Sequence, residues 1–226
     1  GSSWDIILLS SEDAGKKLTF TLLSPYESFS GKVGPILYGY KSDLIFGIMK
    51  EQMGQLFVAT LMLAIGIGLF MFYAIKAKAG TRNVHIAYLA LFAVFCSLYL
   101  FGESRMLQFF LSNEFLITAL PFLSQNVFPI PLLMYIREKW MPRHRWIATV
   151  FLWAFTINFI VTIVLQMTGI ADLYETIVVF HIIVVAFMVA ILVISYREIF
   201  KYQYKESFVL AQALGVLILG SAIGIY

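Results

Sequence analysis

The chain has 226 residues, of which 61% are hydrophobic and 13% are charged, and its formal net charge is +3. Soluble domains are about 45–50% apolar and about 25% charged, so this composition excludes an ordinary soluble domain and indicates an integral membrane protein. The small net charge does not predict nucleic-acid binding. The single cysteine, Cys96, excludes a disulfide within the chain.

The first 40 residues have a strand-like pattern. Apolar and polar residues alternate from 17 to 22, and short apolar runs occupy 4–9 and 36–40, which predicts two or three strands. So few strands cannot bury a core of their own. We therefore interpret residues 1–40 as the C-terminal strands of an incomplete extracytoplasmic β-sandwich.

The rest of the chain is predicted to be helical. Residues 41–52 are expected to form a linker helix, because Ser42 and Asp43 can cap its start. Residues 53–226 contain six apolar runs of roughly 18–23 residues, close to the ~20 residues needed to cross about 30 Å of hydrocarbon. The runs are apolar all round, unlike the amphipathic core helices of soluble proteins. The predicted spans are 53–75, 84–101, 115–136, 146–167, 176–195 and 208–226.

Basic residues in the short loops predict the orientation of this bundle. The loops after the first, third and fifth spans are basic, whereas the opposite side carries only Arg105. The positive-inside rule places the basic loops in the cytoplasm and residues 1–40 outside. Six spans that begin outside also end outside, so inward signalling requires a seventh span after Tyr226. The basic residues counted are Lys76, Lys78, Arg82, Arg137, Lys139, Arg143, Arg145, Arg197, Lys201 and Lys205.

The fold class predicted from these patterns is mainly α: a polytopic helical membrane bundle with six spans present and a seventh missing, preceded by the partial β-sandwich. Glu103 lies just past the second span, at the predicted outer interface. One hypothesis gives it a contact with the outer domain, a ligand or another span. The alternative is an ordinary interfacial charge that extends to water. Arg105 is two residues further on, so on a helix it points in a different direction.

Polar side chains inside the predicted spans are the other candidate ligand or coupling residues. His181 lies in the outer half of the fifth span, where an ionisable residue is a candidate for a proton or metal role. A neutral histidine hydrogen-bonded to a neighbouring helix is the simpler alternative. Gln125 and Asn126 in the third span, with Asn158 and Gln166 in the fourth, are expected to form interhelical hydrogen bonds. A polar cavity between the third, fourth and fifth spans stays open as a hypothesis.

Prolines and glycines predict bending and close packing. Pro129 and Pro131 are expected to kink the third span near its inner end, either as a hinge or as a static feature. Gly66 and Gly68 predict a small-residue packing face in the first span. A GxxxG motif occupies 220–224, and it favours packing within one bundle over dimerisation.

Catalytic and metal-binding motifs are absent from the sequence. It has no HExxH, no CxxC, no Gly-rich phosphate loop and no close pair of intramembrane carboxylates. The only histidines are His85, His144 and His181. We therefore expect this chain to have no enzymatic activity, no bound metal and no cofactor.

Four segments carry a resemblance to a known family. They are 4–26 followed by 35–40, 41–55, 99–108 (beginning YLFGESR) and 120–135 (LPFLSQNVFPIPLLMY). In that order they are similar to the last jelly-roll strands, the linker, the end of span 2 and span 3 of the bacterial seven-transmembrane receptors with diverse intracellular signalling modules. The resemblance implies a sensor whose outer carbohydrate-binding-like domain and seven spans control a cytoplasmic GGDEF-type diguanylate cyclase or, less often, a histidine kinase. The start of the jelly-roll, the seventh span and the output domain are missing from this chain, so no catalytic residue can be transferred to it.

These observations together predict the sensor region of a bacterial signalling receptor in the cytoplasmic membrane, with its N-terminus outside. The expected partners are the lipid bilayer, an unknown external small molecule or carbohydrate, and a second copy in a homodimer formed through the bundle. A transporter or channel component is the alternative. That class typically shows internal repeats and broken helices with polar groups at mid-membrane. The sequence shows no clear repeat, and its span centres are nearly uncharged.

Overall fold

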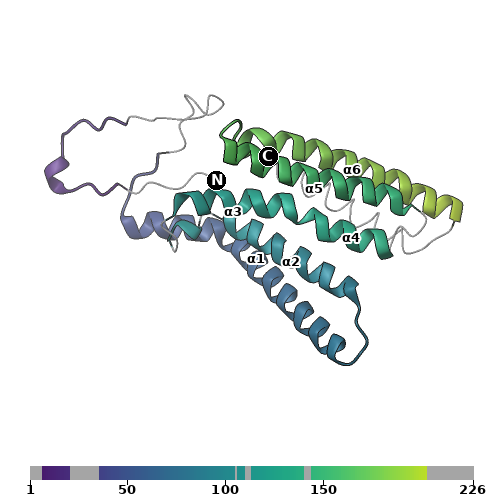
Figure 1. Cartoon of the computed structure of the whole chain (residues 1–226). Coiled ribbons are helices and arrows are strands. Elements are labelled where there is room, and N and C mark those ends of the chain that lie inside the picture. Colours follow the sequence, from purple (N-terminus) through teal and green to yellow (C-terminus); the bar gives the residue numbers. More distant parts are fainter. Residues whose placement is uncertain (1–6, 21–35, 105, 110–112, 140–143, 203–226) are drawn as a thin grey trace.

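The structure is a computed structural model, and its described part is mainly helical (Figure 1). The described residues are 7–20, 36–104, 106–109, 113–139 and 144–202. Within them, five helical segments are long and apolar enough to cross a membrane. The elements in chain order are η1 (Ser11–Asp13), α1 (Lys41–Lys78), α2 (Val84–Glu103), η3 (Met106–Phe109), α3 (Glu114–Val127), α4 (Pro129–Lys139), α5 (Arg145–Thr168) and α6 (Leu173–Tyr202).

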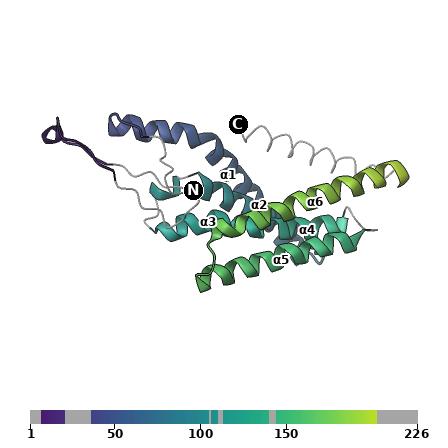
Figure 2. The same ribbon diagram turned by 90° about the horizontal axis from the view of Figure 1, so that it is seen from above.

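Five of the six predicted spans correspond to these segments, and the sixth, 208–226, lies outside the described residues. The predicted linker 41–52 is helical, but it is not a separate element. It forms the first part of α1, a helix of 38 residues that extends about 57 Å at 1.5 Å per residue. That length exceeds the hydrocarbon thickness. The first turns of α1 run in a different direction from the rest of the helix (Figures 1 and 2).

The strands expected near the N-terminus are not found in the described residues. Residues 16–20 and 36–40 have no strand assignment, so the strand predicted at 36–40 is wrong. Residues 4–6 and 21–22 of the other two predicted strands lie outside the described residues. A strand needs a neighbour to pair its backbone groups. The alternation of Leu18 and Phe20 with polar residues therefore does not by itself produce one here, and both side chains are exposed.

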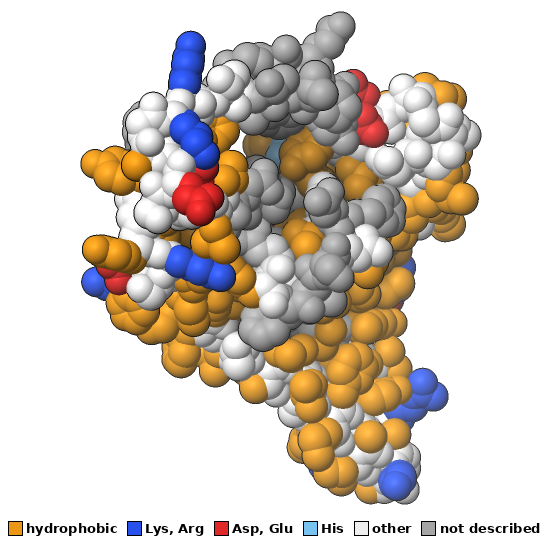
Figure 3. Space-filling view, turned by 90° about the vertical axis from the view of Figure 1, so that its left-hand side faces the viewer, with side chains coloured by type: hydrophobic (Ala, Val, Ile, Leu, Met, Phe, Trp, Pro, Cys, Tyr) orange, Lys and Arg blue, Asp and Glu red, His pale blue; other side chains and the backbone are white. Residues whose placement is uncertain are grey.

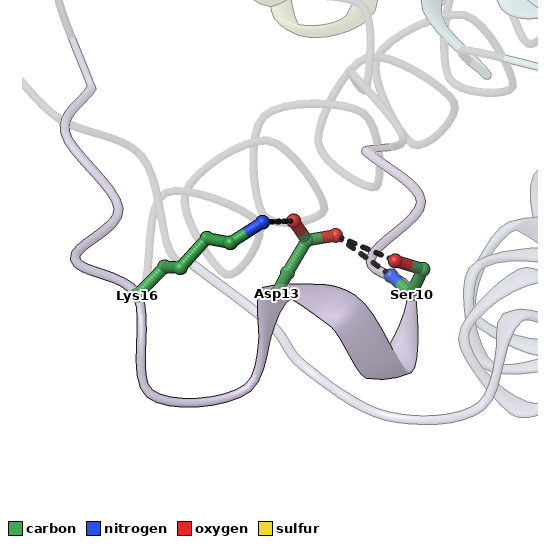
Figure 4. A network of polar contacts seen from close by, with 3 residues as sticks. All are labelled: Ser10, Asp13 and Lys16. Atoms are coloured by element: carbon green, nitrogen blue, oxygen red, sulfur yellow. Dashed lines mark hydrogen bonds and ion pairs between the residues drawn. The ribbon is translucent and has the colours of Figure 1, made fainter.

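A short polar turn at η1 lies within the described residues of the N-terminal segment (Figure 4). The Asp13 carboxylate accepts hydrogen bonds from the Ser10 backbone N–H at 2.9 Å and from the Ser10 hydroxyl at 3.0 Å. It also pairs with Lys16 Nζ at 3.0 Å. The Ser10 backbone bond, followed by the Lys16 and Ser10 side-chain bonds, holds the pKa of Asp13 below its ordinary value of 3.8.

This turn has a predicted pH dependence. Because the folded-state pKa of Asp13 is lowered, the turn is stabilised above pH 3.8 and loses this stabilisation as the pH falls through the lowered value. An NMR titration of the Asp13 carboxyl carbon is expected to show a midpoint below 3.8. Ser10→Ala and Lys16→Gln should each move the midpoint upward. A wild-type midpoint at or above 3.8 would contradict the contacts at Ser10 and Lys16.

The helices form two hairpins on either side of a central span (Figures 1 and 2). α1 packs against α2 and α5 packs against α6, while the span formed by α3 and α4 contacts both α2 and α5. Half of the apolar window of this central span is buried, against 11–22% in the other four. Movement of the central span therefore changes contacts with both hairpins.

The main apolar core lies between α4, α5 and α6. Phe155 of α5 is 1% exposed and packs against Phe180 and Phe187 of α6, with ring centroids 5.7 and 6.2 Å apart. The buried residues of this cluster are Leu133, Ile136, Phe155, Phe180, Phe187, Ile191 and Ile194. Aromatic edges and branched side chains interlock in this core, and dispersion between such groups is what holds helices together in lipid.

Small residues allow α1 and α2 to approach closely. Gly66 is buried, and a Cβ placed there would lie 2.7 Å from Val94 Cγ2 and 3.3 Å from the Ala90 carbonyl oxygen. The packing role predicted for Gly66 is therefore present. Gly68 is exposed and has nothing near the position of a Cβ, so the same prediction is wrong for Gly68. The two glycines lie on different faces of α1 because two residues on a helix are separated by about 200°.

The two ends of the bundle differ in charge. The alternating helix directions bring Lys76, Lys78, Arg82, Arg137, Lys139, Arg145 and Arg197 to one end. Glu103, Asp172 and Glu175 lie at the opposite end. Figure 3 shows that the surface of the α1–α2 hairpin between these ends is largely hydrophobic, with Lys and Arg side chains at the tip. An apolar surface between two polar ends is what a bilayer requires.

Candidate functional site

Prolines remove backbone hydrogen bonds from the central span near its middle, at the boundary between α3 and α4, which we call the division. α3 ends at Val127, Phe128 follows, and Pro129 is the first residue of α4. Because proline has no N–H, Pro129 and Pro131 cannot donate to the carbonyls four residues earlier, those of Gln125 and Val127. Both prolines are buried. The division therefore lies inside the bundle, beside the prolines for which a hinge was predicted; the hinge role itself stays a prediction.

A buried amide pair joins the central span to α5 close to this division. Asn158 Nδ2 donates to Asn126 Oδ1 at 2.9 Å, and Asn126 Nδ2 donates to the Phe122 carbonyl of its own helix at 3.0 Å. Asn126 is 4% exposed and Asn158 is 8% exposed. Asn158 lies about 20 Å along α5, near the middle of a helix that crosses the membrane. The interhelical bond expected of these residues is present at mid-membrane depth.

Asn158 belongs to a polar stripe along one face of α5. Thr162 and Gln166 follow it at intervals of four residues, so the three side chains share a face. Thr162 is 2% exposed. Gln166 Oε1 accepts a hydrogen bond from the backbone N–H of Leu173 at 2.9 Å, which satisfies one unpaired donor at the start of α6. The stripe thus ties α5 to α3 at one point and to α6 at another. We refer to Asn126, Asn158, Thr162 and Gln166 as the polar seam.

The polar seam contains amides and a hydroxyl but no ionisable group. Such groups exchange hydrogen bonds and do not carry protons or bind a metal strongly. In the described part of the chain, no group of three or more His, Cys, Asp or Glu side chains could hold a metal ion. The polar seam can hold α3, α5 and α6 in fixed relative positions. If the hydrogen bond between Asn126 and Asn158 breaks, α3 and α5 can move relative to each other.

The outer end of α2 packs tightly against the central span. Glu103 is the last residue of α2 and is half-buried, while Arg105 lies outside the described residues. Next to Glu103, a Cβ added to Gly102 would lie 2.7 Å from Pro121 Cδ and 2.9 Å from Pro121 N. Ser104 is fully buried and donates its hydroxyl to the Phe101 carbonyl at 2.7 Å. Glu103 is therefore held at a closely packed corner between α2 and α3.

His181 is not part of the polar seam. Its side chain is exposed on α6, next to the exposed apolar residues Val178, Ile182 and Val185. The ring contact with Phe180, at 5.8 Å between centroids, is to a neighbour in its own helix. His181 therefore does not face the neighbouring helices, and the polar cavity hypothesised between the third, fourth and fifth spans stays a prediction. Gln125, one residue before Asn126, is half-buried.

Two further polar contacts join α1 to α2 and were missed in the sequence. The Ser97 hydroxyl donates to the Ala59 carbonyl at 2.8 Å, and Gln55 Nε2 donates to the Leu100 carbonyl at 3.0 Å. Ser97 and Ala59 are both fully buried. These contacts could have been predicted from the sequence, because Ser97 and Gln55 are polar residues within largely apolar spans.

Comparison with protein-family models, curated proteins and solved structures gave no match to this chain. The assignment of function therefore rests on the arrangement of residues described above.

The amide pair has a measurable contribution to stability. Asn158→Ala is expected to lower the free energy of unfolding by about 1 kcal/mol, since it removes an interhelical hydrogen bond. A double-mutant cycle with Asn126→Ala should give a coupling energy of about 0.6 kcal/mol, measured by SDS titration followed by circular dichroism. Thr156→Val is the control, because within the described part of the chain the Thr156 hydroxyl bonds only the Leu152 carbonyl of its own helix. A coupling energy of zero would contradict the pairing.

Proposed function

We propose that this chain is the membrane sensor region of a bacterial signalling receptor, which relays an external signal to a cytoplasmic output domain. The observation that supports the proposal best is the position of the divided span. α3 and α4 lie between two helical hairpins, and the division is beside the Asn126–Asn158 hydrogen bond. A signal that changes the angle between α3 and α4 would shift both hairpins at once.

The mechanism we propose is a two-state change in the central span. In one state the Asn126–Asn158 bond holds α3 against α5, and in the other state the bond opens and α4 moves relative to α3. A ligand shifts this equilibrium only if it binds the two states with different affinity. Glu103, at the outer corner where α2 meets α3, is the proposed contact with an outer β-sandwich domain. The proposed ligand is an extracellular small molecule or carbohydrate.

The orientation that goes with this function places residues 7–20 outside and the basic end inside. Its test is labelling of intact cells with a membrane-impermeant maleimide, after Cys96 is replaced by serine. A cysteine at Asp172 should be labelled, whereas a cysteine at Lys78 should be labelled only after the cells are opened. The reverse pattern would contradict the orientation and the positive-inside argument behind it.

The experiment that tests the relay uses the full-length coding sequence expressed in bacteria. Cyclic-di-GMP and autophosphorylation are measured, since a diguanylate cyclase and a histidine kinase are the two outputs expected. We expect Asn158→Leu to change the output at least about threefold, because a two-state equilibrium responds to about 0.7 kcal/mol by this factor. Thr156→Val should leave it unchanged. Equal outputs for wild type and Asn158→Leu would refute a relay through the polar seam.

A transporter is the second candidate, and one feature favours it. Two prolines remove backbone hydrogen bonds from the central span beside buried polar residues at mid-membrane depth. Interrupted helices with polar groups at this depth are common in secondary transporters. Liposomes containing a proton or sodium transporter would lose an imposed ion gradient faster than empty liposomes. The sensor proposal predicts equal rates. The absence of an ionisable side chain in the polar seam favours the sensor, because ion-coupled transport usually uses one.

A further inference from the structure

A depression of about 730 Å³ opens at the basic end of the bundle. One wall is the turn between α1 and α2 with the first turn of α2, and the other is the end of α4. Its lining residues are Gly80, Thr81, Arg82, Asn83, Val84, His85, Tyr88, Glu138 and Lys139. Its size is within the range of sites that hold small ligands. It is separate from the polar seam, which runs along α5 from mid-membrane depth to the opposite end of the bundle.

The lining carries a net positive charge. Arg82 and Lys139 are exposed cations from opposite walls. The one acidic residue of the lining, Glu138, is already paired with Arg137 at 3.0 Å, so its charge is offset. The first turn of α2 adds the partial positive charge of a helix start. An anion in the depression would therefore meet two cations and no unpaired carboxylate of the lining.

Contacts with Tyr73 fix the orientation of the Arg82 guanidinium. Its Nε donates to the Tyr73 hydroxyl at 2.6 Å, and its guanidinium lies over the Tyr73 ring at 5.7 Å. This arrangement uses Nε and leaves the two Nη groups without a hydrogen bond among the described residues. Two parallel N–H donors match two oxygens of a phosphate group. A fixed guanidinium loses less entropy on binding than a free one.

The position of the depression indicates the source of the anion. α1 ends at Lys78, α2 begins at Val84 and α4 ends at Lys139, so all three span ends meet there. The ends of spans lie at the depth of the lipid headgroups, where anionic phosphates are concentrated. Basic depressions between spans at this depth suit such headgroups. We propose that this depression binds the phosphate headgroup of an anionic phospholipid, held between Arg82 and Lys139.

The test uses the full chain in a nonionic detergent and measures bound lipid by native mass spectrometry during titration with phosphatidylglycerol or phosphatidylcholine. We expect phosphatidylglycerol to bind at least tenfold more tightly. The double variant Arg82→Gln/Lys139→Gln should weaken phosphatidylglycerol binding about thirtyfold, since each cation near a lipid surface contributes about fivefold. Arg82→Lys/Lys139→Arg keeps both charges and should retain binding within about fivefold, which separates loss of charge from misfolding.

Lys76→Gln/Lys78→Gln is the matched control, because it removes two charges from the same end without touching the lining. It should weaken binding less than about threefold. An equal loss in this control would show a diffuse charge effect and overturn the site. Equal binding of the two lipids would also overturn it. Binding of inorganic phosphate without binding of phosphatidylglycerol would assign the depression to a free anion and overturn the lipid source.

Discussion

Replacing Gly102 by leucine is expected to destabilise the bundle by about 3 kcal/mol or more. A Cβ at this position would lie 2.7 Å from Pro121 Cδ, 2.9 Å from Pro121 Cβ and 2.9 Å from Pro121 N. These atoms belong to a rigid ring and its backbone, so they cannot rotate away, and α2 must move from α3 instead. The measurement is the SDS midpoint of unfolding, followed by circular dichroism.

Gly68→Leu is the matched control for this substitution. It makes the same chemical change in another membrane helix, at an exposed position where nothing lies within 4 Å of the added Cβ. We expect a change in stability of less than about 1 kcal/mol. A similar loss at both positions would mean that glycine is needed for the helices themselves and would contradict the close contact at Pro121.

Phe155→Ala is the second substitution with a large expected effect, about 3 kcal/mol of lost stability. Phe155 is 1% exposed and lies against Phe180 and Phe187, and removing its ring would open a cavity in the core between α4, α5 and α6. In lipid the cost comes from lost dispersion contacts, since lipid tails are as apolar as the core. This loss of stability is measured as the shift in the unfolding midpoint of the purified chain in detergent.

Trp153→Ala is the control for Phe155→Ala. Trp153 belongs to the same helix two residues earlier, but it is 60% exposed on the lipid-facing side. Removing it should cost less than about 1 kcal/mol, because lipid or detergent replaces the lost contacts. If Trp153→Ala were as harmful as Phe155→Ala, α5 would have to be rotated from the orientation described here.

The positions of the membrane helices could be predicted from the sequence because length and apolar composition decide them. The five spans within the described residues follow from runs of about 20 apolar residues, and the basic ends follow from the loop sequences. The boundary predicted between linker and span at residue 52 does not exist in the structure. Residues 41–78 form one helix, and the sequence contains no proline there that would have ended a linker.

The directions in which side chains face could not be predicted for helices that are apolar all round. α6 has no polar stripe to distinguish its inner face, so the sequence left the direction of His181 open. The same limit applies to the contact between Gly102 and Pro121, which depends on how α2 and α3 meet. Asn126 and Asn158 were recognisable as interhelical donors, but the choice of partner came from the packing of α3 against α5.

The most direct test of the sensor proposal is the coding sequence of the parent gene after the codon for Tyr226. A receptor that relays an external signal inward requires a seventh apolar run followed by a cytoplasmic output domain, since the five described spans and the sixth predicted at 208–226 would return the chain to the predicted outer side. We predict an apolar run of about 20 residues and then a diguanylate cyclase or histidine kinase domain. A stop codon directly after Tyr226 would contradict the proposal, because no part of the chain beyond short loops would then reach the cytoplasm.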